Sequence, residues 1–327
     1  MLARKKRNTP VIVITAFLIL LIAVVPQFTS TYTVRILSVA LINYLCVLSV
    51  YVLLGLCGQN SFAQAGFWGI GAYIAGNILT KTFGGSLTAF VAAVCGTAFL
   101  AFILGFAFFR LRQYYFTFAS IGLMTILNVL FINWVDFSGG ALGMKEIPTF
   151  QLFGFSADSE TSKLYVVFAV CLVATFLILL LFHSSLGRSF MAIRDNEMAA
   201  DSMGINSLLT KSIAFAISGA LCGAAGAMWA SVSGYLSYQS FTYNQSTIYL
   251  VMIMIGGTGS PIGALIGTAA ITILQEGFRS LQDYMQLIYG IGVIILMIFQ
   301  PEGIWGGGKI LYERFRKHRE KSKVSAV

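Results

Sequence analysis

The stretch closest to an enzyme motif spans residues 303–310, where the letters GIWGGGKI match the G-x-x-x-x-G-K spacing of a phosphate-binding loop. Such a loop needs Ser or Thr directly after the lysine, because that hydroxyl binds Mg²⁺, and it follows a strand of a soluble domain. Ile310 takes that position here, and an apolar run precedes the glycines. We therefore interpret this stretch as a flexible exit from the apolar run, and we expect no ATPase site in the chain.

The cysteines and histidines are too scattered for metal or redox chemistry. The five cysteines lie in or at the ends of apolar runs, with no C-x-x-C spacing and no neighbouring histidine. The two histidines, His183 and His318, are far apart in the sequence. Because no nucleophile–base pair is evident either, we predict no catalytic residue, no metal site and no bound cofactor, and we interpret the cysteines as small packing residues.

The most informative polar stretch is residues 183–211, which separate two long apolar runs. Apolar side chains alternate there with arginine and acidic residues, and glycines at both ends act as helix breakers. This pattern predicts a short amphipathic helical unit, although a solvated connector would also fit. The residues that we single out in it are Gly187, Arg188, Ala192, Arg194, Asp195, Glu197, Ala199 and Gly204.

Two apolar regions are interrupted by glycines, one at residues 55–76 and one at residues 256–267. Paired broken segments in the two halves of a membrane protein indicate a transport pathway. Close helix packing would also explain the glycines, and a location at a boundary would explain the polar residues of the first region. The pathway candidates are Gln59, Ser61, Gln64, Gly257 and Gly259. We interpret Asn43, Asn77 and Asn128, which are isolated in apolar runs, as interhelical hydrogen-bonding residues.

The composition places these segments in a membrane. Of all residues 57% are hydrophobic and 10% are charged, whereas a soluble domain has about 25% charged residues. The net charge of +9 comes from short basic clusters between apolar runs, so it does not indicate a nucleic-acid partner. The apolar runs are continuous, which favours helices over a barrel. We predict an all-α polytopic membrane protein.

Stretches without charged residues define about 9–10 transmembrane segments, since a helix needs about 20 apolar residues to cross a bilayer. The tract 245–275 is too long for one span, so we expect two short segments that meet near residues 256–261, where the letters are GGTGSP. The predicted spans are 11–27, 35–54, 62–80, 87–109, 114–133, 164–182, 212–234, the two segments of 245–275, and 285–300.

Lysine and arginine collect in cytoplasmic segments of membrane proteins, and this rule predicts that both termini are cytoplasmic. The expected organisation has five parts. These are a cytoplasmic N-terminus (1–10), a first transmembrane half (11–182) with an external loop (134–163), a cytoplasmic loop (183–211), a second half (212–305) and a basic cytoplasmic tail (306–327).

Residues 187–205 fit the pattern G-R-x-x-x-A-I-R-D-N-x-x-A-A-x-x-x-G-I. This pattern resembles the cytoplasmic coupling loop of ATP-binding-cassette importer permeases, in particular the LivM-like permeases of branched-chain amino acid importers. The resemblance extends over residues 35–306. Family members usually carry a small residue and a histidine near residues 62–64, and more often proline than Ala141. Further matching stretches are 55–73, 139–143, 256–263 and 301–304.

The resemblance implies a permease subunit in the cytoplasmic (inner) membrane of a bacterium. It implies that two ATP-binding-cassette ATPase subunits hydrolyse ATP beneath it, that a second homologous permease completes the pathway, and that an extracytoplasmic binding protein delivers leucine, isoleucine or valine. Permeases for urea and short amides resemble the chain almost as well. A stand-alone secondary transporter is a further alternative, but the predicted spans lack the internal charges that proton-coupled carriers use.

Overall fold

The computed structural model describes residues 30–81, 85–111, 113–152 and 155–278, together with residues 287, 290, 291 and 303. The predicted spans 11–27 and 285–300 and both predicted cytoplasmic termini lie outside these residues, apart from those single positions. The helices in chain order are α3 (Thr31–Val50), η1 (Tyr51–Leu56), α4 (Gln64–Lys81), α5 (Ser86–Phe108), α6 (Gln113–Asn133), α7 (Val135–Ser138), η2 (Gly140–Leu142), α8 (Glu160–His183), α9 (Ser185–Asp195), α10 (Glu197–Ser202), α11 (Ser207–Ser233), η3 (Tyr238–Ser240), α12 (Tyr243–Gly256) and α13 (Pro261–Gly277).

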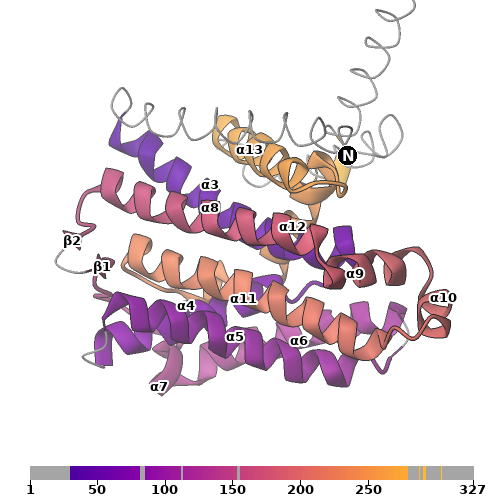
Figure 1. The fold of residues 1–327 in the computed structure, drawn as a ribbon. Helices are drawn as coiled ribbons and strands as arrows, with labels where there is room; N and C mark the ends of the chain where they lie inside the picture. The colour runs from indigo at the N-terminus through magenta and orange to yellow at the C-terminus, as the bar shows by residue number, and fades with distance from the viewer. Residues whose placement is uncertain are drawn as a thin grey trace, which may run out of the picture.

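The long helices form one bundle, in which α9 and α10 project at one end and the short strands β1 (Gln151–Leu152) and β2 (Phe155–Ser156) lie at the other (Figure 1). In the described residues five helices are long and apolar enough to cross a membrane, or six if the bent pair α12–α13 counts as one span. These five are α3 continued by η1, α5, α6, α8 and α11. The prediction of an all-α polytopic membrane protein is therefore confirmed.

Helix α4 coincides with the predicted span 62–80 but is not among those five helices. It begins with Gln64, ends with Lys81 and contains several glycines, so its mean hydropathy is low for a lipid-facing segment. Most of its residues, including Trp68 and Tyr73, are buried among other helices. A helix that contacts protein and little lipid does not need a uniformly apolar surface.

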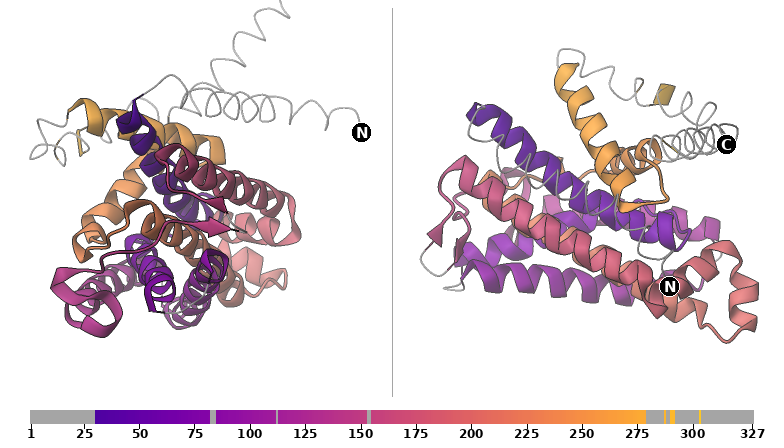
Figure 2. Two further views of the ribbon diagram at one scale, coloured as in Figure 1. Left: turned by 90° about the vertical axis from the view of Figure 1, so that its left-hand side faces the viewer. Right: turned by 45° about the horizontal axis from the view of Figure 1, so that its top comes forward.

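Helix α11 packs closely between α4 and α5, and glycines make this approach possible (Figure 2). A Cβ atom at Gly223 would lie 2.0 Å from Thr97 Oγ1 in α5, and one at Gly226 would lie 2.4 Å from the Trp68 carbonyl oxygen in α4. Small residues at such crossings let backbones approach and gain dispersion contacts, which hold helices together where lipid provides no hydrophobic driving force.

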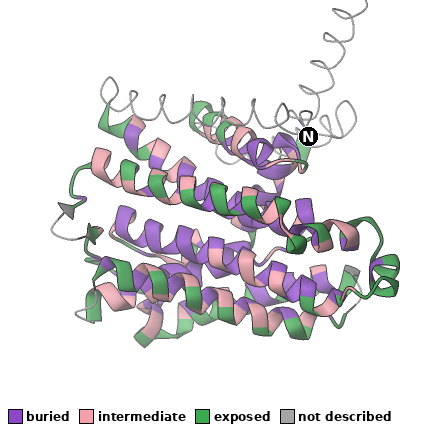
Figure 3. Cartoon of the chain, viewed as in Figure 1, coloured by how far each residue is buried: buried purple, intermediate pink, exposed green. Residues whose placement is uncertain are grey.

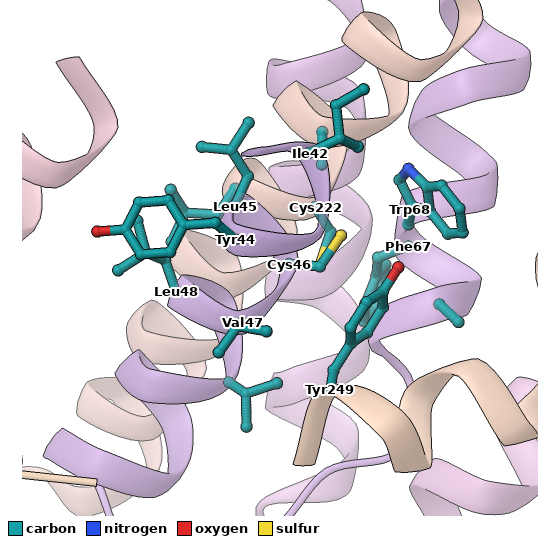
Figure 4. Close-up of a cluster of buried hydrophobic side chains, with 14 of the residues drawn as sticks. Ile42, Tyr44, Leu45, Cys46, Val47, Leu48, Phe67, Trp68, Cys222 and Tyr249 are labelled. Atoms are coloured by element: carbon teal, nitrogen blue, oxygen red, sulfur yellow. The ribbon is translucent and has the colours of Figure 1, made fainter. Parts of the chain in front are cut away.

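The centre of the bundle is filled by buried side chains, whereas the outer faces of several helices are exposed and apolar (Figure 3). Cys46 of α3, Phe67 and Trp68 of α4, Cys222 of α11 and Tyr249 of α12 converge in this core (Figure 4). The exposed apolar side chains include Phe99, Phe118 and Phe176. An apolar exterior around a packed core is what a bilayer requires of a polytopic protein.

The segment 134–163 folds over the end of the bundle opposite α9. Met144 and Leu236 form an isolated antiparallel bridge, with backbone hydrogen bonds of 3.0 and 2.9 Å. The strands β1 and β2 pair antiparallel, with Gln151 opposite Ser156. The carboxylate of Asp158 accepts hydrogen bonds from Ser156 and Thr149, and these bonds lower its pKa. The bridge between Met144 and Leu236 attaches the segment to the turn that follows α11.

The tract 243–277 consists of α12 and α13, which are bent by 116° at a short break. The sequence predicts a break near residues 256–261, and the chain bends there. Ser260 caps α13 by accepting a hydrogen bond from the backbone N–H of Ile262, and Pro261 occupies the first turn, where its missing N–H costs nothing. Gly263 packs against the Gly257 carbonyl oxygen, and Gly267 packs against that of Met252.

Candidate coupling element and pathway segments

The residues between α8 and α11 form two short helices, α9 and α10, which we call the coupling element (residues 184–206). Each helix begins at a residue whose side chain caps it. Ser184 Oγ accepts a hydrogen bond from Gly187 N, Asn196 Oδ1 from Ala199 N, and Asn206 Oδ1 from Leu209 N at the start of α11. These caps satisfy N–H groups that a helix start leaves unpaired. They fix three consecutive changes of chain direction.

Helix α9 is amphipathic, as its sequence predicts. Phe190 and Ile193 are buried against the bundle. The tip of the coupling element carries two exposed methionines, Met198 at 80% and Met203 at 84% exposure. Methionine is a flexible and polarisable side chain that adapts to a partner surface. The element therefore has one face on the helical bundle and one apolar tip that points away from it.

The residues singled out from the sequence are divided between these two faces. Gly187 is buried where α8 meets α9, and a Cβ atom there would lie 2.1 Å from the Leu181 carbonyl oxygen. Its role in the structure is therefore to let the two helices join at close range. Ala192 is half-buried. The exposed residues of the set are Arg188, Arg194, Asp195, Glu197, Ala199 and Gly204.

Arg194 reaches from α9 to the irregular end of α3. Its Nη1 atom donates a hydrogen bond of 2.7 Å to the carbonyl oxygen of Gly55 in the π-helical turn η1. Its stem passes Gly58, which has a φ of 70° and would clash with Arg194 Cγ if it carried a Cβ atom. Sequence reasoning did not find this contact, because the two residues are 139 positions apart. The sequence shows glycines at positions 55 and 58, but it does not indicate that Arg194 contacts them.

Glu197 and Lys211 connect α10 to α11. Lys211 Nζ lies 2.5 Å from Glu197 Oε1, and the lysine side chain is 5% exposed. Asp201 Oδ1 accepts a hydrogen bond of 2.6 Å from the Ser207 hydroxyl nearby. A buried ammonium group needs such a partner, because desolvation of an unpaired charge is costly. The coupling element is therefore held by polar bonds to both halves of the chain.

The polar pathway candidates are buried between η1 and α4. Gln59, Ser61 and Gln64 are 4%, 1% and 1% exposed. The Ser61 hydroxyl accepts a hydrogen bond from Ala63 N, so it shapes the turn before α4. Gln64 Oε1 is buried and has no hydrogen-bond partner. Burial raises the pKa of the Cys57 thiol in the same turn to about 12.

The structure brings the two glycine-interrupted regions into contact. A Cβ atom at Gly55 would lie 2.6 Å from the carbonyl oxygen of Thr258, in the break between α12 and α13. Gly257 is buried against Gly303, whereas Gly259 is exposed and has open space around its Cα. The contact lies beside Arg194, so the break and the coupling element meet at the same end of the bundle.

Isolated asparagines in the helices link distant segments, as the sequence predicts. Asn77 Nδ2 donates to the Phe137 carbonyl oxygen at 2.6 Å, and Asn128 Nδ2 donates to that of Phe241 at 2.8 Å. Asn43 Oδ1 accepts a hydrogen bond of 3.4 Å from the Tyr249 hydroxyl. These side chains are therefore occupied with packing.

A polytopic helical bundle with glycine-broken segments and an amphipathic element at one end defines the molecule as a membrane transport protein of the permease class. The family model described as "Branched-chain amino acid transport system / permease component" matches residues 32–299. The chain belongs to this family of permease components.

Several curated permeases are similar to the chain. The high-affinity branched-chain amino acid transport system permease protein LivM of Salmonella typhimurium is 30% identical over 311 residues, which are 88% of this chain and 73% of the relative. LivM of Escherichia coli K12 is 30% identical over 303 residues, 85% of this chain and 71% of the relative. The autoinducer 2 import system permease protein LsrC of Escherichia coli K12 (DH10B) is 23% identical over 221 residues, 63% of this chain and 62% of the relative. No solved structure matches the chain.

Proposed function

We propose that the chain is a permease subunit of an ATP-binding-cassette importer in the bacterial cytoplasmic (inner) membrane, and that it carries leucine, isoleucine and valine. The family match over residues 32–299 carries this proposal. The 30% identity to two LivM proteins named for branched-chain amino acid transport supports the same cargo. LsrC, which is named for another cargo, is less similar and covers less of the chain.

We propose that two partner ATPase subunits hydrolyse the ATP and that the coupling element docks on one of them. The exposed Met198 and Met203 support this, because an apolar tip beyond the packed bundle suits a partner's groove. The polar bonds of Arg194 and Glu197 to the bundle would make a displaced coupling element move helices with it. A second homologous permease and an extracytoplasmic binding protein complete the assembly that we propose.

The pathway is proposed to run along the turn 57–63, next to the contact between Gly55 and the break at residues 257–260. Gln64 is the best placed of the polar candidates, since its buried carbonyl oxygen lacks a partner in this conformation. A weakly polar lining would let a zwitterion with an apolar side chain pass, while the binding protein selects it. Urea or a short amide is a weaker candidate cargo, and a stand-alone carrier is not favoured.

Competition uptake tests the cargo. Cells that express the chain with its partner subunits should take up labelled leucine, and unlabelled isoleucine and valine should reduce that uptake, whereas excess urea should not. A matched strain that lacks only this chain provides the background. Leucine uptake equal to that background, or competition by urea alone, would refute the assignment.

A further inference from the structure

The π-helical turn at the end of α3 lies between the coupling element and the break of the second half. On one side, the Gly55 carbonyl oxygen accepts the 2.7 Å hydrogen bond from Arg194. On the other side, Thr258 lies so close that a Cβ atom at Gly55 would be 2.6 Å from its carbonyl oxygen. The Tyr51 ring borders the same space at 2.7 Å, so a side chain on residue 55 would not fit and the Gly55 backbone lies directly against Thr258. π-Helical turns occur frequently at functional sites.

The break next to Gly55 has the features of a hinge. Gly257 has a φ of 108°, a conformation that residues with a side chain rarely adopt, and Gly259 has no neighbouring atom within 4 Å of its Cβ position. Helices α12 and α13 are bent by 116° around it. Hinges are a few residues that absorb large changes in backbone angles. A small displacement of Gly55 therefore acts directly on the bend between α12 and α13, where Gly257 is packed against Gly263 and Gly303.

Asp195 accepts hydrogen bonds of 3.3 Å from the Arg194 guanidinium, whereas Arg188 and Glu197 make contacts elsewhere. Arg188 Nη1 donates to the His183 carbonyl oxygen, at the joint between α8 and α9. Glu197 is paired with Lys211 of α11. Arg194 thus provides a charged contact from α9 to the turn that touches the break.

We propose that Arg194 is a positioning residue that links movement of the coupling element to the hinge at residues 257–260, through the carbonyl group of Gly55. This inference rests on the proposed function and specifies which part of the membrane domain responds to the ATPases. When the coupling element shifts, Arg194 pulls the η1 turn with it, and the break changes its angle. Loss of the link leaves ATP hydrolysis intact but disconnects it from transport.

Arg194→Met tests the link in the full complex of permeases, ATPases and binding protein reconstituted in proteoliposomes. Methionine keeps apolar contact with Gly58 but cannot donate to Gly55. We expect ATPase subunits to assemble normally and hydrolysis to stay within about twofold, whereas leucine imported per ATP falls about tenfold, the factor that a charge-assisted hydrogen bond commonly contributes. Arg194→Lys, which keeps a donor and the charge, should recover part of the loss.

Arg110→Met is the matched control, because Arg110 is an exposed arginine near the same end of the bundle that stacks on Phe106 at 5.1 Å and lies outside the coupling element. It should leave the transport-to-hydrolysis ratio unchanged. An unchanged ratio in Arg194→Met would overturn the proposal. Loss of ATPase assembly in that variant would overturn it too, because Arg194 would then be a docking contact.

A measurement on the native chain is independent of folding of the variants. Cys57 lies in the turn between Gly55 and Gly58 and is fully buried. If the turn moves with the coupling element, alkylation of Cys57, followed by mass spectrometry, should differ by at least about twofold between the nucleotide-free complex and one locked with a non-hydrolysable ATP analogue. Equal labelling would overturn the link. Failure of native ATPase subunits to bind, or of native complex to import leucine, would instead refute the proposed function.

Discussion

Replacing Glu197 by glutamine should destabilise the permease, because the Lys211 ammonium group would stay buried without its anion. The lysine side chain is 5% exposed and the glutamate side chain 46% exposed, with Nζ and Oε1 2.5 Å apart. Removing one partner of a fully buried pair costs about 3–5 kcal/mol. Water reaches the glutamate carboxylate, so we reduce this figure to about 1–3 kcal/mol for the free energy of unfolding.

The assay is a double-mutant cycle on purified permease in detergent, with thermal unfolding followed by tryptophan fluorescence. Glu197→Gln should lower the midpoint by about 2–4 °C per kcal/mol. Lys211→Met removes the charge and keeps most of the volume, so Glu197→Gln/Lys211→Met should regain most of the stability that Glu197→Gln loses. Asp195→Asn is the control, because the Asp195 side chain is 72% exposed and its loss should cost less than about 0.5 kcal/mol.

Two results would refute this reasoning. An unchanged midpoint in Glu197→Gln would mean that Lys211 does not depend on Glu197. A double variant whose loss equals the sum of both single losses would mean that the two side chains do not interact.

Three further predictions follow from packing, burial and placement. Gly226→Val should prevent recovery of monodisperse permease in size-exclusion chromatography, because its Cβ atom would lie 2.4 Å from backbone atoms of α4. Gly122→Val should be recovered normally, since nothing lies within 4 Å of a Cβ atom there, and equal recovery of the two variants would contradict the helix crossing. The raised pKa of Cys57, about 12, keeps its thiol protonated, so iodoacetamide should label it slowly between pH 7 and 9, and the thiolate fraction should grow only as the pH approaches 12. The exposed control Met198→Cys should be labelled rapidly, and rapid labelling of Cys57 would show that the turn is open. Met198 and Leu142 are 80% and 79% exposed at opposite ends of the bundle, so cysteines there should react with an impermeant reagent from opposite sides of the membrane. Leu142→Cys should be labelled in intact cells, and labelling of Met198→Cys instead would invert the predicted orientation.

The helices that the structure describes follow from the sequence because the bilayer imposes a simple rule on composition. Charge-free runs of sufficient length became α3, α5, α6, α8 and α11. The break in the tract 245–275 was also readable, since Gly256 to Pro261 cannot continue a helix without interruption. The close packing of α11 depends on Gly223 and Gly226, where a Cβ atom would clash with α5 and α4.

The contacts that position the candidate site could not be predicted from the sequence in the same way. Arg194 donates to a backbone carbonyl oxygen, and every residue has one. The residue types in the sequence therefore do not indicate which distant residue Arg194 contacts. Gly187 was interpreted as a helix breaker, whereas the structure places it inside α9, buried where α8 and α9 join. Local patterns determine where helices begin and end, whereas the approach of α9 to the η1 turn depends on the packing of the whole bundle.

Import by purified components tests the central claim most directly. Proteoliposomes that contain this chain, its partner permease and the ATPase subunits should accumulate leucine against a gradient only when ATP and the loaded binding protein are both supplied. Proteoliposomes with the permease alone should accumulate none. Concentrative uptake by the permease without ATPase subunits or nucleotide would contradict the account.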